Sequence, residues 1–63
     1  MKILLKKVRT EKHMTMRQLA KLSGIHNSEI SLIENGRTVP TVQTMCLLAK
    51  ALGVKLCDLV KCD

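Results

Sequence analysis

Two short amphipathic segments meet at Gly24, and this junction is the sequence feature that most constrains the fold. Before it, Thr15 and Gln18 form a capping-box pattern, in which each side chain accepts a hydrogen bond from the other residue's backbone N–H. The pattern predicts a helix over residues 16–23, and Gly24 ends that helix because glycine adopts the left-handed backbone conformation without strain. A second helix is predicted over residues 27–34, so the chain must turn sharply between two very short helices.

Small and branched side chains around the junction indicate how these two helices pack. Ala20 faces the place where the following helix must cross, and its small side chain lets the two helix axes approach closely. The angle between the helices is filled by three isoleucines, Ile25, Ile30 and Ile33. This arrangement is typical of a helix-turn-helix, and the alternative is an ordinary corner between two helices of a bundle. His26 and Asn27 are both candidate N-caps of the second helix, and asparagine is the better capping residue type.

Periodicity and capping residues predict three further helices, over about residues 2–12, 41–52 and 55–61. The side chains expected to face inward are Leu4, Leu5, Val8, Leu19, Ala20, Leu22, Val42, Met45, Leu48, Ala49, Leu52, Leu56, Leu59 and Val60. The 63 residues include no Phe, Trp or Tyr, which favours helices over a β-sandwich or barrel. We therefore expect one domain over residues 1–63, an all-α fold with five helices in a compact bundle.

The net charge of the chain is +6, from 11 basic and 5 acidic residues, which favours a polyanionic partner such as nucleic acid or anionic lipid. The lack of aromatic residues excludes RNA-binding sheets and OB-folds, which stack bases on aromatic rings. No apolar run approaches the length of a membrane span, and MKILLKK is too short in its apolar centre for a signal peptide, so a cytoplasmic protein is expected. An enzyme is not indicated, because His13 and His26 have no acidic or thiol residue at useful spacing.

The three cysteines, Cys46, Cys57 and Cys62, all lie in the second half of the chain. An odd number is a poor basis for a disulfide framework, so reduced thiols are expected, with Cys46 at least partly buried. A zinc site usually includes a Cys-X-X-Cys pair, which this sequence lacks. We therefore expect neither a metal ion nor a cofactor.

Five motifs follow one another in fixed order: T-x-x-x-L-A from Thr15, Gly24-Ile25, I-S-x-I-E-N-G over residues 30–36, Pro40-Thr41, and L-A-K-A-L-G-V over residues 48–54. Together they resemble the Cro and lambda-repressor type of helix-turn-helix domain, the xenobiotic-response-element (XRE) family. The resemblance extends from Leu5 to Val60, and the combination in this register is specific although each motif alone is weak. It implies a sequence-specific, double-stranded DNA-binding regulator of transcription, a repressor or controller, whose helix 27–34 enters the major groove.

Helical geometry independently identifies the outer face of the helix 27–34. When its two isoleucines are buried, the opposite side carries Ser28, Ser31 and Leu32, and Asn27 lies at its edge near the helix start. Asn27 is the strongest base-reading candidate, because an asparagine amide can bond both N6 and N7 of adenine. Leu32 is explained either by contact with a thymine methyl group or by packing against a neighbouring loop.

The resemblance also implies where phosphates are held. One site would use backbone N–H groups and a basic side chain just after the helix 27–34, and another would lie at the start of the helix 16–23. Many family members place Gln directly after the capping Thr, whereas this chain has Met16, so a neighbouring residue must replace that contact. The candidate phosphate-binding residues are Thr15, Arg17, Gln18, Asn35, Gly36 and Arg37.

Charge is distributed unevenly along the chain: the net charge is +6 over residues 1–21, −2 over residues 22–36 and +2 over residues 37–63. The positive field therefore comes from the neighbours of the helix 27–34 and not from that helix. The resemblance implies that Arg9 pairs with Glu34 across the domain. This pair would neutralise one of the two acidic residues of the helix 27–34.

Domains of this family usually bind DNA as symmetric pairs, so a homodimer is expected. Leu47 lies opposite the predicted core stripe of the helix 41–52 and could form an apolar contact with Val60, Cys57 or Cys62, although a lone exposed leucine is equally common. A second hypothesis is a module of the same fold that binds an unidentified protein partner and has lost DNA binding. Met16 and the lack of positive charge on the helix 27–34 favour this alternative.

Overall fold

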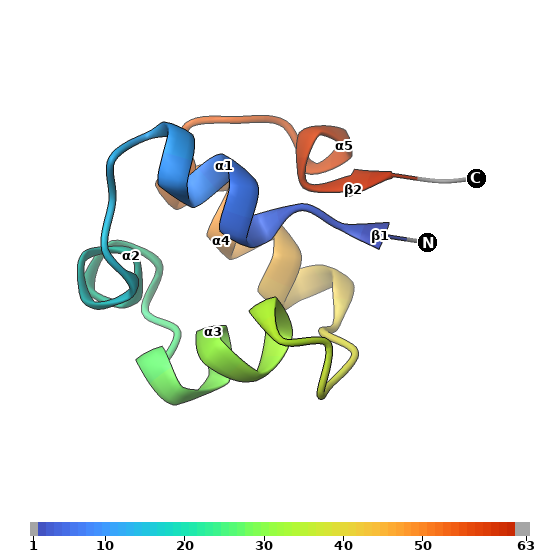
Figure 1. Cartoon of the computed structure of the whole chain (residues 1–63). Coiled ribbons are helices and arrows are strands. Elements are labelled where there is room, and N and C mark those ends of the chain that lie inside the picture. Colours follow the sequence, from blue (N-terminus) through green and yellow to red (C-terminus); the bar gives the residue numbers. More distant parts are fainter. Residues whose placement is uncertain (1, 62–63) are drawn as a thin grey trace.

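The computed structural model describes residues 2–61, in which five helices are joined by short loops and the two ends form short strands (Figure 1). In chain order the elements are β1 (Lys2–Ile3), α1 (Leu5–Glu11), α2 (Met16–Ser23), α3 (Asn27–Glu34), α4 (Val42–Leu52), α5 (Leu56–Leu59) and β2 (Val60–Lys61). The predicted five-helix fold is therefore confirmed, and the structure adds a short pair of strands to the all-α architecture expected from the sequence.

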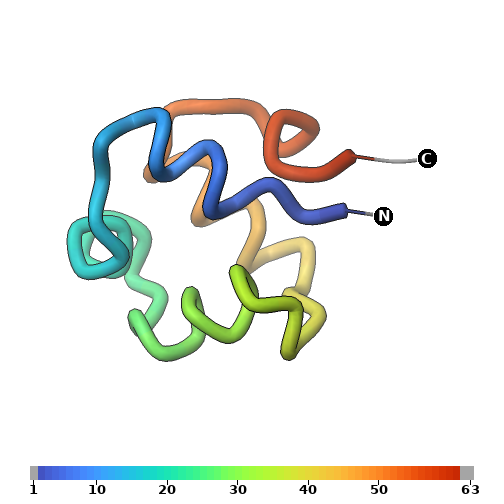
Figure 2. The backbone as a smooth tube through the Cα atoms, viewed as in Figure 1, coloured from blue at the N-terminus to red at the C-terminus, as the bar shows by residue number. Residues whose placement is uncertain are grey.

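One hydrophobic core lies between the helices, and every helix contributes to it. The tube in Figure 2 shows α2 and α3 forming one corner of the molecule, while the two described ends of the chain lie side by side away from that corner. The buried core side chains are Leu5, Val8, Leu19, Ile30, Ile33, Met45, Leu48, Ala49, Leu52 and Leu59. Both isoleucines of α3 belong to this set, so the orientation of α3 is fixed by the core.

The first and last helices are shorter than predicted. The chain enters α1 only at Leu5, because β1 pairs with β2 in antiparallel register, with Ile3 opposite Val60. The backbone N–H of Leu4 also donates to the carbonyl of Leu59, at an N···O distance of 2.7 Å. Because the end of α5 lies beside the start of the chain, these backbone groups bond to each other instead of extending the two helices.

Three residues predicted to be at least partly inside are exposed instead. Leu22 on α2 is 63% exposed, and Val42, the first residue of α4, is 71% exposed. Cys46 is exposed as well, since the buried stripe of α4 runs through its neighbours Met45, Leu48, Ala49 and Leu52. Other predicted inward residues, such as Ala20 and Leu56, are half-buried and pack against the core.

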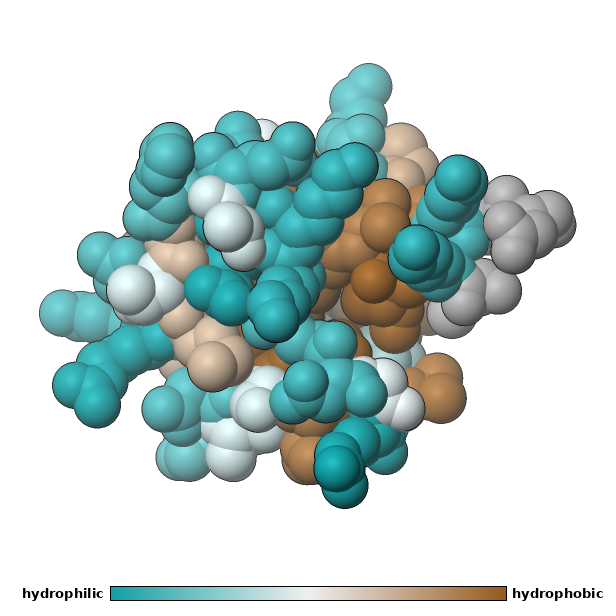
Figure 3. All heavy atoms as spheres, viewed as in Figure 1, coloured by the Kyte–Doolittle hydropathy of each residue, from teal (hydrophilic) through white to brown (hydrophobic). Residues whose placement is uncertain are grey.

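Hydrophilic side chains cover most of the face seen in Figure 3, and the hydrophobic residues visible there gather mainly beside the strand pair. None of the helices in residues 2–61 is long and apolar enough to cross a membrane. Within the same residues, no cluster of three His, Cys, Asp or Glu side chains is positioned to hold a metal ion.

Candidate nucleic-acid interface

Local hydrogen bonds define both ends of α2, and so the place where the chain turns into α3. The Thr15 hydroxyl accepts from the Gln18 N–H at 3.1 Å, and the Gln18 side-chain oxygen accepts from the Thr15 N–H at 2.9 Å, so both halves of the capping box are present. At the other end of α2, Gly24 has φ +78° and its N–H donates to the carbonyl of Ala20 at 2.9 Å. This left-handed residue redirects the chain into α3 within a few residues.

The N-cap of α3 is His26 and not Asn27. The imidazole Nδ1 of His26 accepts a hydrogen bond from the backbone N–H of Ser28 at 3.2 Å and lies 2.8 Å from the Ser28 hydroxyl. Asparagine is the better cap in general, but capping by His26 makes Asn27 the first residue of the helix and leaves its side chain exposed. The Asn27 amide is therefore available to an external partner.

The outer face of α3 carries the four residues identified from the sequence. Asn27, Ser28 and Leu32 are exposed, with 43% of Leu32 accessible, so no loop within residues 2–61 covers that leucine completely. Ser31 is half-buried, and its hydroxyl lies 3.3 Å from the side-chain amide nitrogen of Asn35, which donates to it. Asn27 and Leu32 thus point outward, whereas the hydroxyls of Ser28 and Ser31 already lie within hydrogen-bonding distance of His26 and Asn35.

The segment after α3 has fewer free donors than the resemblance implies. The backbone N–H groups of Asn35, Gly36 and Arg37 donate to the carbonyls of Ser31, Ile33 and Leu32 at distances of 2.9–3.2 Å. The Asn35 side chain also donates to the Ser31 carbonyl at 2.9 Å. Of the groups expected to hold a phosphate here, the exposed guanidinium of Arg37 remains the strongest free donor.

The start of α2 offers a second set of donors. The first-turn N–H groups of Met16 and Arg17 have no partner within the helix, as at the start of any α-helix. The Met16 side chain is half-buried and packs against the core, so it anchors the helix at a position where the resemblance implies a polar residue. The side chains of Arg17 and Gln18 are exposed, and the Gln18 amide nitrogen is not used by the capping box.

Arg9 and Glu34 lie together on the inner side of α3. Arg9 Nε donates to Glu34 Oε2 at 2.6 Å and Nη2 donates to Oε1 at 3.1 Å, a bidentate pair whose side chains are only 13% and 4% exposed. Arg9 Nη1 also donates to the carbonyl of Met14 at 2.8 Å. The pair joins α1 to the last residue of α3 and to the loop before α2, so it fixes the helix-turn-helix on the rest of the domain.

The environment of Arg9 reinforces its positive charge. The hydrogen bonds that Arg9 donates to Glu34 raise the pKa of its guanidinium above the ordinary value, burial lowers that pKa, and the negative charge of Glu34 raises it further. Because the folded-state pKa is raised, the resulting stabilisation is fully present below the unfolded-state pKa and is lost only as pH rises through the folded-state value. Arg9 therefore remains charged throughout the pH range in which proteins are normally studied.

The dimer candidates differ in their exposure. Leu47 is 39% exposed on α4, Cys57 is exposed on α5, and Val60 is half-buried in β2; Cys62 lies outside the described residues. An apolar hollow of about 150 Å³ includes Val60 but neither Leu47 nor Cys57, and is lined by Ile3, Pro40, Val42, Met45, Leu56 and Val60.

Two exposed valines were not identified from the sequence as surface residues. Val42 is the first residue of α4, and Val39, which is 82% exposed, directly precedes Pro40. Both positions are a signal that could have predicted their exposure.

Comparisons with known proteins agree with this geometry. A family model described as helix-turn-helix, HTH_3, matches residues 5–59. An uncharacterized HTH-type transcriptional regulator of Sinorhizobium fredii is 41% identical over 54 residues, which cover 86% of this chain and 70% of that protein. An uncharacterized HTH-type transcriptional regulator of Mycobacterium tuberculosis is 43% identical over 42 residues, covering 67% of this chain and 30% of the relative.

A third relative is the ImmF control region 10 kDa protein of Bacillus phage phi105, which is 36% identical over 53 residues, 84% of this chain and 59% of that protein. The chain thus spans between about a third and about two thirds of these relatives. The family match covers α1 to α5, including both helices of the turn and the Arg9–Glu34 pair. From its sequence and its fold, the chain belongs to the Cro/C1-type (XRE) helix-turn-helix family, whose members are DNA-binding transcriptional regulators and not enzymes.

Proposed function

We propose that α3 reads base edges in the major groove of double-stranded DNA, with Asn27, Ser28, Ser31 and Leu32 as the reading residues. The observation that carries this proposal is the division of α3 into two faces. Ile30 and Ile33 are at most 1% exposed, whereas Asn27, Ser28 and Leu32 on the opposite side are exposed. A helix locked into the core on one side and neutral on the other is suited to base edges, which present hydrogen-bonding groups and thymine methyls rather than net charge.

The four reading residues differ in what they recognise. Asn27 is the adenine reader, because its amide can donate to N7 and accept from N6 at the same time. Leu32 covers a thymine methyl group, which explains an exposed leucine among polar residues. Ser28 and Ser31 are adaptable contacts, and each hydroxyl already has a hydrogen-bonding neighbour: Ser28 lies against His26 Nδ1 and Ser31 accepts from Asn35.

Phosphates are held on both sides of the reading helix. At the start of α2 the donors are the Thr15 hydroxyl, the Arg17 guanidinium, the Gln18 amide and the free first-turn N–H groups. After α3 the contact is made chiefly by Arg37, with Asn35 and Gly36 shaping the loop and sharing N–H groups that already bond within it. The basic residues of the N-terminal third supply the long-range attraction that the −2 charge of residues 22–36 cannot supply.

The protein is proposed to act as a homodimer on paired half-sites, because one short helix reads too few base pairs for a unique operator. Two chains of net charge +6 repel each other, so they must meet on an uncharged surface. Leu47 with Cys57 is one candidate, and the apolar hollow beside Val42 and Val60 is the other. Sedimentation at micromolar concentration of Leu47→Glu and Val42→Glu beside the wild type identifies the interface, and a monomeric wild type overturns the dimer.

Selection of bound fragments from a random double-stranded DNA library tests the function. The expected result is a pair of related half-sites about 10 base pairs apart, centre to centre. Asn27→Ala should weaken binding to the selected site by about 5-fold to 150-fold, corresponding to about 1–3 kcal/mol, and leave binding to mixed genomic DNA unchanged. A module that binds a protein partner instead would select no sequence and show no steep salt dependence.

A repressor or controller role would follow from occupancy of a site that overlaps a promoter. Fusing the selected site to a reporter gene and expressing the protein in the same cells decides between lowered and raised transcription. The cytoplasmic location expected from the sequence accords with this proposal, since the partner is DNA.

A further inference from the structure

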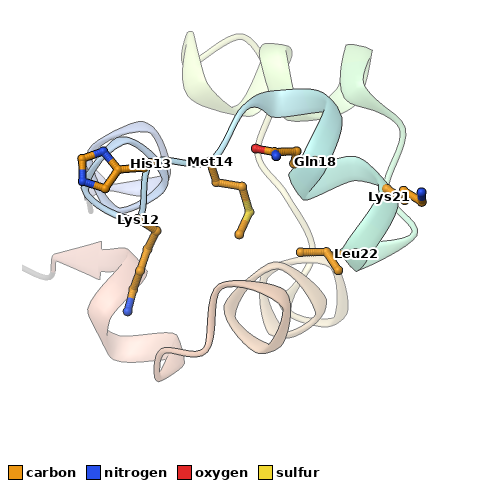
Figure 4. A pocket seen from close by; sticks show the side chains of 6 residues that line it. All are labelled: Lys12, His13, Met14, Gln18, Lys21 and Leu22. Carbon is orange, nitrogen blue, oxygen red and sulfur yellow. The ribbon is translucent and has the colours of Figure 1, made fainter.

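A hollow lies between the end of α1 and the outer flank of α2. Of the residues that line it, only Gln18 belongs to the proposed DNA contacts. It has a volume of about 440 Å³ and is lined by Lys12, His13, Met14, Gln18, Lys21 and Leu22. Figure 4 shows Met14 and Leu22 lying between Lys12 and Lys21, with His13 beyond Lys12. The hollow therefore combines an apolar floor with basic side chains on both sides.

The apolar floor is unusual because Leu22 is not needed by the core. Its spacing from Leu19 predicts an inward side chain, yet 63% of Leu22 is accessible while Leu19 is fully buried. Met14 is half-buried beside it, and its backbone is held in place by the hydrogen bond from Arg9. Leucine and the flexible thioether of methionine together form an adaptable surface onto which an apolar side chain can pack.

The charges around the floor are all of one sign. Lys12, Lys21 and His13 are exposed, and no acidic residue lines the hollow. Within residues 2–61, the one ion pair is Arg9–Glu34, so neither lysine forms an ion pair with a carboxylate of the described residues, although Lys12 also lines a neighbouring hollow with Glu11 and Asp58. A partner that fits this surface must therefore supply both negative charge and an apolar group.

The hollow lies on the side of α2 away from the reading helix. At about 100° per residue, Gln18, Lys21 and Leu22 share one flank of α2, and Ala20 lies on the other. Ala20 lines the groove between α2 and α3 together with Ile25 and Asn27, and Lys21 borders both this groove and the hollow. A partner in the hollow would therefore leave the outer face of α3 open to DNA.

We propose that this hollow is a docking site for an acidic segment of another protein, which places an apolar side chain on Met14 and Leu22 and carboxylates beside Lys12 and Lys21. A DNA backbone offers phosphates but no apolar side chain to cover Leu22. A second copy of this chain carries the same positive charge. A flat bilayer surface does not follow a concave floor. An acidic segment with an apolar residue can contact both the apolar floor and the two lysines, and it can bind while DNA is held.

The test uses the isotope-labelled full chain and short synthetic peptides in an NMR titration. A peptide rich in Asp and Leu should bind saturably and shift the signals of Met14 and Leu22, whereas peptides with Ser in place of Leu, or Lys in place of Asp, should not. Leu22→Ser should weaken binding by about tenfold, with Val39→Ser as a matched control that leaves it unchanged, because Val39 is an exposed apolar residue outside the hollow. Lys21→Glu should weaken it by about fivefold, with Lys50→Glu as its control, because both lysines lie in the last turn of their helix.

Four results would overturn the proposal. They are the absence of saturable binding, equal binding of the Asp–Ser peptide, insensitivity to Leu22→Ser and Lys21→Glu, and displacement of the peptide by DNA. Binding to vesicles of anionic and zwitterionic phospholipid that is lost in the same two variants would also overturn it, in favour of a lipid surface. None of these results depends on whether α3 recognises a specific operator.

Discussion

Replacing Arg9 by alanine should destabilise this domain severely, although Arg9 makes no contact with the proposed DNA-reading residues. The substitution removes two hydrogen bonds to Glu34 and one to the Met14 carbonyl. It also leaves the Glu34 carboxylate without a counter-charge in a position where only 4% of the side chain is exposed, so water cannot replace the guanidinium. Breaking a buried pair in this way costs about 3–5 kcal/mol of unfolding free energy.

That loss is large compared with the stability of so small a domain. At about 0.05–0.15 kcal/mol per residue, 63 residues give a total of about 3–9 kcal/mol. With an unfolding entropy of about 2.1 cal/mol/K per residue, a loss of 3 kcal/mol lowers Tm by about 20 °C. Arg9→Ala is therefore expected to be marginally folded at room temperature.

Urea unfolding followed by far-UV circular dichroism measures this, because the chain has no aromatic residue for intrinsic fluorescence. Arg17→Ala is the matched control, since Arg17 is an exposed arginine outside the core. The double variant Arg9→Ala/Glu34→Ala should lose less than the sum of the single variants by about 2 kcal/mol, because it leaves no unpaired charge. A loss for Arg9→Ala within about 0.5 kcal/mol of the Arg17→Ala control would refute the reasoning.

Four further expectations follow from the same structure. Because Glu34 raises the pKa of Arg9, the loss in Arg9→Ala should be the same at pH 7 and pH 9 in urea titrations. Gly24→Ala should cost about 1–2 kcal/mol in the same assay; the space around Gly24 is open, so the cost comes only from φ +78°. Ala20→Leu should cost about 1–3 kcal/mol by overpacking the crossing of α2 and α3, and its Tm would show this in thermal unfolding. Arg37→Ala should weaken binding to all DNA sequences alike and reduce the slope of log K against log salt concentration by about 1, measured by fluorescence anisotropy with labelled DNA.

The helices and the turn could be predicted from the sequence because their causes are local. The reciprocal Thr15–Gln18 cap and the left-handed Gly24 depend on residues a few positions apart, and the structure shows both bonds of the cap. The bounds of α2 and α3 agree with the predicted ranges for the same reason. Local spacing left His26 and Asn27 as alternative caps, and the hydrogen bond from the Ser28 N–H to His26 Nδ1 decides for His26.

The start of the first helix and the end of the last helix could not be predicted from the residues near them in the sequence. Nothing in the segment around Ile3 indicates that Val60 lies opposite it, and only the packing of α5 beside α1 brings the two together. The candidate interface shows a similar division. The outward position of Asn27 follows from helical periodicity, whereas the prior use of the Ser31 hydroxyl and the Gly36 N–H depends on how the chain closes after α3.

By itself, the sequence determined the helical class, the sharp turn at Gly24 and the neutral outer face of α3, because these depend on caps, glycine conformation and a repeat of about 3.6 residues. Only the tertiary structure decided which apolar side chains are buried, since burial depends on the elements that lie opposite them. Leu22 and Leu19 share the periodicity of one helix, yet only Leu19 faces the core. The exposed leucine and the strand pair at the chain ends are both consequences of contacts between segments that are distant in the sequence.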